Sequence, residues 1–185
     1  MASFLRQFKR GSTSAVKTKI RCVAGDIVSI GTDIIVNAAN ADLIAGGGVC
    51  GAIFAAAGKH ELQKACDEHG GCPTGSAVIT PAFHLEKYGT KHIIHAVGPR
   101  FSQARAEECD RELMSAYRSA LRLAQNVGAR SIAIPAISTG IFRFPVERAA
   151  TLVAELLSSE SFDLDEIVLM ALESEKIAHY AHALA

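Results

Sequence analysis

Two asparagines and a run of glycines give residues 34–58 the strongest potential for ligand chemistry in this chain. An apolar stretch at 34–36 leads to Asn37 and Asn40, and three glycines at 46–48 then precede an alanine-rich segment. Glycines let the backbone approach a ligand closely, and the first N–H groups of a helix have no partner within the chain. These N–H groups and the helix dipole favour phosphate. The alternative is a tight strand-to-helix turn that binds nothing.

Two further loops carry polar groups directly after apolar stretches. Asp26 follows residues 18–24, and its carboxylate could accept hydrogen bonds from an adenine amino group or a ribose hydroxyl, or could be an ordinary turn residue. Residues 137–142 follow residues 131–135 and bring hydroxyls, a glycine and successive backbone N–H groups, which suit phosphate. Together the loops suggest a dinucleotide-like ligand with a diphosphate. The chain has no GxxxxGK[ST] motif and no GxGxxG after its first strand, so P-loop and Rossmann sites are not favoured.

Strand and helix patterns alternate along the chain and would bring these loops together. The predicted strands are residues 18–24, 33–36, 76–81, 91–97, 131–135 and 166–171, and the predicted helices are residues 49–57, 61–69, 104–125, a segment starting near Pro145, and 175–183. This order predicts a three-layer α/β/α sandwich with a mixed, mostly parallel central sheet. Ligands of such sheets bind beyond the carboxyl ends of the strands, which is where all three loops would lie.

The composition limits the classes of function. The chain has 185 residues, 49% of them hydrophobic, and a net charge of zero, which suits one domain and argues against a broad electrostatic contact with nucleic acid. Its five cysteines form no CxxC pair, which argues against a disulfide framework and favours a reducing compartment. Cys66 and Cys72 with the nearby histidines match no zinc-finger spacing, so neither a metal nor a cofactor is expected. No apolar run approaches the ~18 residues of a membrane span, and the chain is expected to be monomeric.

The start of the chain is basic. Residues 1–19 contain five lysines and arginines and no acidic residue. We expect residues 1–16 to form a tail or an extra edge strand, ahead of a single domain at 17–185. A cytoplasmic location is expected, with import into an organelle through the basic tail as the alternative.

Five motifs in order resemble one family. GDI at 25–27, VNAAN at 36–40, GGGV-x-GAI at 46–53, HAVGP at 95–99 and ISTGIF at 137–142 are similar to those of the macrodomain family, and most similar to its MacroD-type branch. That branch removes ADP-ribose from proteins and deacetylates O-acetyl-ADP-ribose. The resemblance extends from about Lys17 to the C-terminus and implies the α/β/α fold of that family.

The resemblance also implies a role for each loop. Asp26 would take the adenine amino group with the Ile27 backbone beside it, and Asn40 would bond the distal ribose and orient the scissile bond, while Asn37 would brace the loop. Phe142 would lie against the distal ribose. The two loops around the diphosphate would be formed by Gly46, Gly47, Gly48 and Val49 on one side and Ser138, Thr139, Gly140 and Ile141 on the other.

Three positions depart from the pattern of the active branch. Cys50 stands where an aspartate usually helps to orient ribose and water, Phe54 stands in place of a histidine one helical turn later, and Ala45 replaces a glycine. Cys50 is either a thiol whose ionised form the helix dipole would favour, or a neutral thiol that packs against the ribose. Two other possible bases are His84, in a loop, and His95, which is expected to be a hydrogen-bonded core residue because its strand is apolar.

The resemblance therefore implies hydrolysis of ADP-ribosyl esters by a positioned water. The substrates would be O-acetyl-ADP-ribose, mono-ADP-ribosylated Asp or Glu on proteins, or both. Positioning alone can supply several kcal/mol, and a general base adds about 10²–10⁴-fold, so the change at Cys50 is compatible with slower turnover. The alternatives are a non-catalytic ADP-ribose reader and a slow phosphatase acting on ADP-ribose 1″-phosphate.

Overall fold

The computed structural model describes residues 18–185, so the expected N-terminal tail at 1–16 lies outside the described residues. The six strands are β1 (Lys19–Ala24), β2 (Ile34–Ala38), β3 (Ala77–Pro81), β4 (His92–Ala96), β5 (Ser131–Pro135) and β6 (Glu166–Ala171). The helices are α1 (Gly48–Ala57), α2 (Lys59–Asp67), α3 (Ala106–Asn126), α4 (Val146–Ser159) and α5 (Ser174–Ala183). Three short 3₁₀ turns, which the sequence analysis missed, are η1 (Ile27–Ser29), η2 (Phe83–Tyr88) and η3 (Gln103–Arg105).

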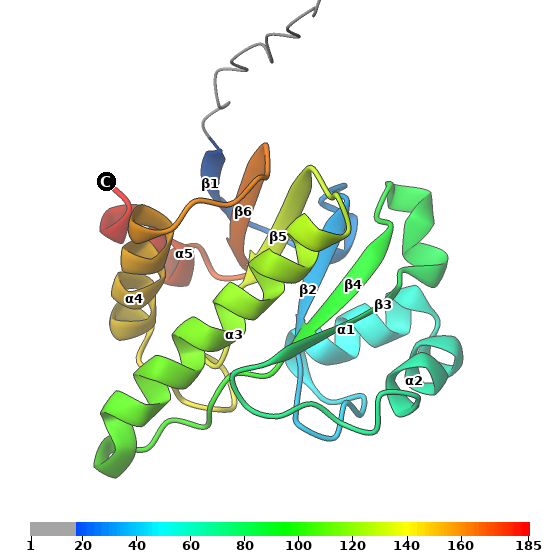
Figure 1. The fold of residues 1–185 in the computed structure, drawn as a ribbon, viewed down its shortest axis with the longest axis horizontal. Helices are drawn as coiled ribbons and strands as arrows, with labels where there is room; N and C mark the ends of the chain where they lie inside the picture. The colour runs from blue at the N-terminus through cyan, green and yellow to red at the C-terminus, as the bar shows by residue number, and fades with distance from the viewer. Residues whose placement is uncertain (1–17) are drawn as a thin grey trace, which may run out of the picture.

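The strands form one mixed sheet in the order β1-β6-β5-β2-β4-β3 (Figure 1). Only the edge strand β3 runs antiparallel, against β4, and the other pairs are parallel. The central strands are buried on both faces, which explains why β2 and β5 appear in the sequence as continuous apolar runs. The predicted mixed, mostly parallel sheet is confirmed.

Each face of the sheet is covered by its own helices. One core contains the buried side of α3, including Tyr117, together with residues of α4 and α5, and Figure 1 shows α3 crossing in front of the sheet. The other core contains Ile53 and Phe54 of α1 and Leu62 of α2. The sheet with helices on both faces confirms the three-layer α/β/α sandwich.

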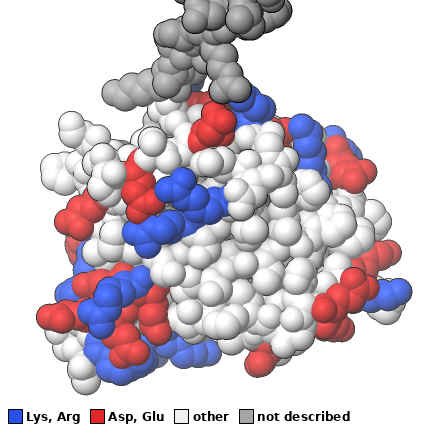
Figure 2. Space-filling model, viewed as in Figure 1, with Lys and Arg blue, Asp and Glu red and all other residues white. Residues whose placement is uncertain are grey.

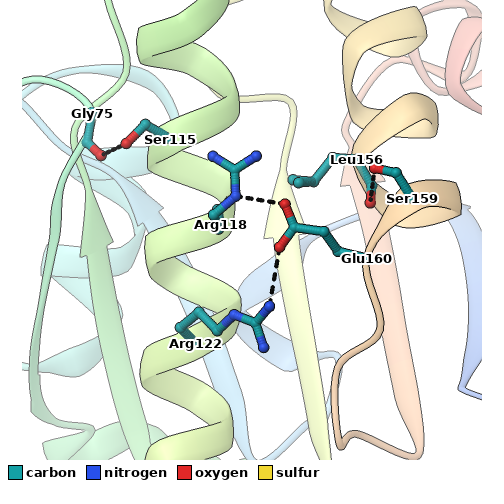
Figure 3. A network of polar contacts seen from close by, with 7 residues as sticks. All are labelled: Gly75, Ser115, Arg118, Arg122, Leu156, Ser159 and Glu160. Atoms are coloured by element: carbon teal, nitrogen blue, oxygen red, sulfur yellow. Dashed lines mark hydrogen bonds and ion pairs between the residues drawn. The ribbon is translucent and has the colours of Figure 1, made fainter.

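Paired charges join α3 to the end of α4. The guanidinium groups of Arg118 and Arg122 donate to the two carboxylate oxygens of Glu160, at 2.7 and 3.0 Å (Figure 3). These ion pairs lower the pKa of Glu160. Figure 2 shows basic and acidic side chains next to one another on this face rather than one extended basic surface. Within residues 18–185, no helix is both long and apolar enough to cross a membrane.

Candidate functional site

A cleft lies along the carboxyl ends of the strands. It has a volume of about 460 Å³, within the range of small-molecule sites. Residues that follow β1, β6, β5, β2 and β4 all contribute to its lining, from Asp26 at one end of this row to Arg100 at the other. Every residue that the sequence analysis assigned to ligand binding lines the cleft.

Asp26 lies at the β1 end of the cleft. Its Oδ1 accepts a hydrogen bond from the Val28 N–H at 3.0 Å and thereby caps η1. The carboxylate is exposed and retains its second oxygen for a ligand. The capping hydrogen bond fixes the orientation of the carboxylate, and the next residue, Ile27, is buried. The arrangement suits a donor such as an exocyclic amino group.

The glycine loop forms one wall in the middle of the row. Gly48 begins α1 with φ +60, a conformation that side-chain-bearing residues rarely adopt. The next turn packs closely, since a Cβ on Gly51 would lie 2.6 Å from the carbonyl oxygen of Gly46. The N–H groups of residues 46 and 47 donate no hydrogen bond within residues 18–185, and those of Gly48 and Val49 belong to the first helical turn. All four N–H groups are thus available to an anion.

The facing wall is the loop that follows β5. It is held by hydrogen bonds from Arg143 N to Gly140 O and from Phe144 N to Ser138 O, both 2.9 Å. Ser138 adopts φ +66, which is unusual for a residue with a side chain and marks a tightly constrained turn. In the described part of the chain, the N–H groups of Ser138, Gly140, Ile141 and Phe142 donate to no other residue. The two loops face one another, because a Cβ on Gly47 would lie 3.8 Å from Cδ1 of Ile141.

Tyr117 supports this second loop from below. Its hydroxyl donates to Pro135 O at 3.1 Å and accepts from Ile137 N at 3.2 Å, so one buried group bridges the turn between β5 and the loop. Burial raises the pKa of Tyr117 to about 12, and the hydroxyl therefore stays protonated as a donor. Tyr117 lies within the predicted helix at 104–125, and its local sequence gives no sign of this contact with the loop.

Removing this hydroxyl is expected to loosen the loop. Tyr117→Phe should reduce the free energy of unfolding by about 1 kcal/mol, because Pro135 O and Ile137 N each lose the hydroxyl but keep their hydrogen bond to each other at 2.8 Å. Denaturant titration measures the change, with Tyr88→Phe, on a half-exposed ring, as the matched control. Equal stability of the two variants would show that the Tyr117 hydroxyl does not hold the turn.

Asn40 stands beside the glycine loop with its amide already oriented. Its Nδ2 donates to Ile44 O at 2.8 Å and its Oδ1 accepts from Ile44 N at 3.1 Å. An amide has two donors and can accept twice, so one donor and one acceptor position remain free at the cleft. The loop from 40 to 44 is therefore braced by Asn40 itself.

Asn37 does not brace that loop, and the expectation for this residue is wrong. Asn37 lies on β2 directly opposite His95 of β4, and its Nδ2 donates to Nδ1 of His95 at 3.0 Å. Strand alternation directs both side chains below the sheet, into the α1–α2 layer. The side chain of residue 37 therefore lies in the α1–α2 layer and that of residue 40 borders the cleft, although the two residues are close in sequence.

The three departures from the family pattern differ in their position. Cys50 lines the cleft with its side chain almost fully buried, and its Sγ lies 3.9 Å from Ile44 O. Phe54 is 1% exposed and packs edge-on against His95, outside the cleft. Ala45 donates its backbone N–H to Gln63 and is also outside the lining. Only Cys50 directly changes the chemistry of the cleft.

Neither candidate histidine base lies in the cleft. His95 is fully buried and bonded by Asn37 and Thr80, which confirms it as a hydrogen-bonded core residue. His84 belongs to η2, and its ring lies near Gly58 rather than near Asn40. In the described residues, no group of three or more His, Cys, Asp or Glu side chains is arranged to hold a metal ion.

Other cleft residues were missed by the sequence analysis. Arg100 follows β4, and Glu173 and Lys176 follow β6 and form an ion pair at 3.3 Å. Gly98 is required by packing, because a Cβ there would lie 2.2 Å from Oγ of Ser138. Arg100 and Glu173 could have been found by applying the rule for the carboxyl ends of parallel strands to every predicted strand.

Comparison with known proteins finds a family model and relatives that match most of this chain. The Macro domain family model matches residues 36–153. A macro domain-containing protein of Ralstonia nicotianae is 42% identical over 165 residues, covering 89% of this chain and 94% of that relative. A protein of Escherichia fergusonii named O-acetyl-ADP-ribose deacetylase is 46% identical over 147 residues, covering 77% of this chain and 80% of that protein.

Solved structures show the same fold. The Oceanobacillus iheyensis macrodomain with ADP superposes with a TM-score of 0.81 at 36% identity, covering 89% of this chain and 88% of that one. The Trypanosoma brucei macrodomain in complex with ADP-ribose gives a TM-score of 0.79 at 28% identity, covering 95% and 73%. Since the family model matches more than half of the chain and a macro domain-containing relative is 42% identical over 89% of it, this chain belongs to the Macro domain family.

Proposed function

We propose that the protein binds ADP-ribose in this cleft and hydrolyses ADP-ribosyl esters, namely O-acetyl-ADP-ribose and mono-ADP-ribosylated Asp or Glu side chains. The observation that carries the proposal is the pair of facing loops, which line the same cleft and most of whose N–H groups have no acceptor in the described part of the chain. Such a cleft suits a diphosphate. Relatives named O-acetyl-ADP-ribose deacetylase and related structures with ADP or ADP-ribose support the same ligand.

The order of the lining residues supports one direction for the ligand. Asp26 takes the purine at the β1 end, the two loops take the diphosphate, and Asn40 and Phe142 hold the distal ribose toward the β4 end. The ester then lies beside the free donor and acceptor of Asn40. A water held between the diphosphate and the ribose adds across the ester, giving ADP-ribose and the free carboxylic acid, and positioning supplies most of the rate.

One incubation with two measurements tests the proposal. ADP-ribose is titrated calorimetrically into the full chain, and a peptide with ADP-ribose on one glutamate is then followed for release of the modification. Binding with release supports the hydrolase. Binding without release, at equal enzyme and substrate, identifies a reader, and no binding removes the ligand assignment.

Asp26 is the residue whose change tests the ligand itself. Asp26→Ala is expected to weaken ADP-ribose binding by about 10–100-fold, because a hydrogen bond to a carboxylate contributes about 1.5–3 kcal/mol. Asp26→Asn is the matched control, since its amide oxygen can still cap η1 at Val28 while the charge is lost. Calorimetry gives both affinities, and an unchanged affinity in Asp26→Ala would exclude the purine assignment.

Substitutions of Cys50 distinguish a hydrolase from a non-catalytic ADP-ribose reader. The reader is favoured by one observation, a thiol at the cleft position where the active branch has a carboxylate. In a weakened enzyme, Cys50→Asp should raise kcat about tenfold or more, because a carboxylate orients water and accepts a proton. Cys50→Ser, a neutral change of similar size, should stay near the wild-type rate. If Cys50→Asp leaves single-turnover release at zero, the reader assignment is the correct one.

A further inference from the structure

The charges that line the cleft are distributed unevenly. Four charged side chains contribute to the lining: Asp26, Arg100, Glu173 and Lys176. Glu173 and Lys176 pair with each other at 3.3 Å, near the end where Asp26 lies. Arg100 stands alone after β4, and among residues 18–185 no carboxylate lies within ion-pair distance of it. The β4 end of the cleft therefore carries an unbalanced positive charge.

The position of Arg100 is set by its neighbours. Its guanidinium carbon lies 4.4 Å from the ring centroid of Phe142, so the cation covers one face of that ring. The following residue, Phe101, donates its N–H to Phe142 O at 2.9 Å and ties the two segments together. Stacking on a ring uses the face of the guanidinium and leaves its in-plane N–H groups free. Arg100 is exposed and lines the cleft, so a ligand can reach these donors.

The in-plane donors of a stacked arginine match one chemical group especially well. A carboxylate accepts two parallel hydrogen bonds from the guanidinium fork. The diphosphate already has the backbone N–H groups of the two facing loops, which lie between the ends of β5 and β2. Arg100 lies beyond them, next to Phe142, where the acyl side of an ADP-ribosyl ester would leave the cleft.

We propose that Arg100 is a specificity-determining residue that selects protein esters with further carboxylates beside the modified side chain. This inference rests on the proposed function, because it concerns the group attached to ADP-ribose. An acetyl group is neutral and too short to offer a carboxylate. An acidic polypeptide segment presents carboxylates at the mouth of the cleft, where Arg100 has no competing partner.

The test uses two peptides, each with ADP-ribose on a single glutamate. One carries aspartates on both sides of that glutamate and the other carries asparagines, so that only the charge differs. At low ionic strength, kcat/KM of the full chain should favour the acidic peptide by about fivefold, the range of a partly exposed ion pair. The preference should shrink toward one in about 0.5 M salt, where exposed charges are screened.

Variants then assign the preference to Arg100. Arg100→Gln should reduce the ratio to about one, Arg100→Glu should invert it, and Arg100→Lys should keep part of it because the charge remains without the planar fork. Arg111→Gln removes one exposed positive charge from α3 outside the cleft and should keep the wild-type ratio. A wild-type ratio of one, or an unchanged ratio in Arg100→Gln, overturns the inference.

Failure of the proposed function would be seen separately. If neither peptide is hydrolysed but both bind, the proposed hydrolysis is wrong, and the ratio of their calorimetric Kd values tests Arg100 in the same way. An acidic preference in Kd that Arg100→Gln abolishes supports the inference without turnover. Equal Kd values for the two peptides overturn it.

Discussion

Asn40→Ala is expected to lower kcat on an ADP-ribosyl ester by about 10²–10³-fold, the cost of losing one oriented hydrogen-bonding group at a reacting centre. The wild-type amide is fixed in advance, because Ile44 binds it through both its N–H and its carbonyl oxygen. The free donor and acceptor of Asn40 then meet the ribose without a further loss of side-chain entropy. ADP-ribose itself should bind about tenfold more weakly, since the other contacts remain.

The same change also removes the brace of residues 40–44, so a control is needed. Ile44→Ala keeps both backbone hydrogen bonds to Asn40 and removes an exposed side chain, and kcat should stay within about twofold of wild type. Single-turnover release and calorimetric affinity are measured on both variants. If Asn40→Ala turned over at the wild-type rate, Asn40 would not position the ester and the assignment of this loop would be incorrect.

Acid should destabilise the protein through His95, well before the carboxylates are protonated. Burial lowers the pKa of His95 to about 4, with the charge of His69 contributing in the same direction. The hydrogen bonds agree with a neutral ring, since Nδ1 accepts from Asn37 and Nε2 is left to donate to Thr80. The nearby Cys66 remains a thiol, because burial raises its pKa to about 12.

The direction follows from proton binding. Between pH 6.5 and 4 an unfolded histidine is protonated while folded His95 is neutral, so the unfolded state binds more protons and stability falls as the pH falls. Lowering the pKa of His95 from 6.5 to about 4 reduces the free energy of unfolding by about 3 kcal/mol once the pH is below 4. Most of this loss should already be present at pH 4.5.

Denaturant titrations at pH 7 and pH 4.5 measure the effect. His95→Gln cannot be protonated in this range, so it should be less stable at pH 7 but should lose much less stability at pH 4.5 than wild type. His182→Gln, on an exposed histidine, should keep the wild-type pH dependence. Ion-paired carboxylates such as Glu160 and Glu166 have a lowered pKa and act mainly below pH 4.5. Equal pH dependence of His95→Gln and wild type would exclude His95 as the cause.

The sequence was sufficient for the strands and α-helices, though not for the 3₁₀ segments, and for most of the residues that line the cleft. Continuous apolar runs mark β2 and β5 because both faces of these strands are buried, and the apolar spacing along α3 reports its single buried face. The glycines at 46–48 mark a turn that only a residue without a side chain makes easily, as φ +60 at Gly48 shows. Asp26, Asn40 and Phe142 were found because their loops follow strands whose carboxyl ends share one edge.

Only the tertiary structure decided which side chain faces which layer. Asn37 and Asn40 are three residues apart, yet one bonds His95 under the sheet and the other borders the cleft, because β2 ends between them at Ala38. Phe54 and Cys50 lie one helical turn apart and both are buried, but only Cys50, in the first turn of α1, also lines the cleft. The isolated charge of Arg100 and the support of the second loop by Tyr117 depend on contacts between distant strands and helices. Such contacts leave no local pattern in the sequence, because they arise from the order of strands in the sheet and not from the order of residues in the chain.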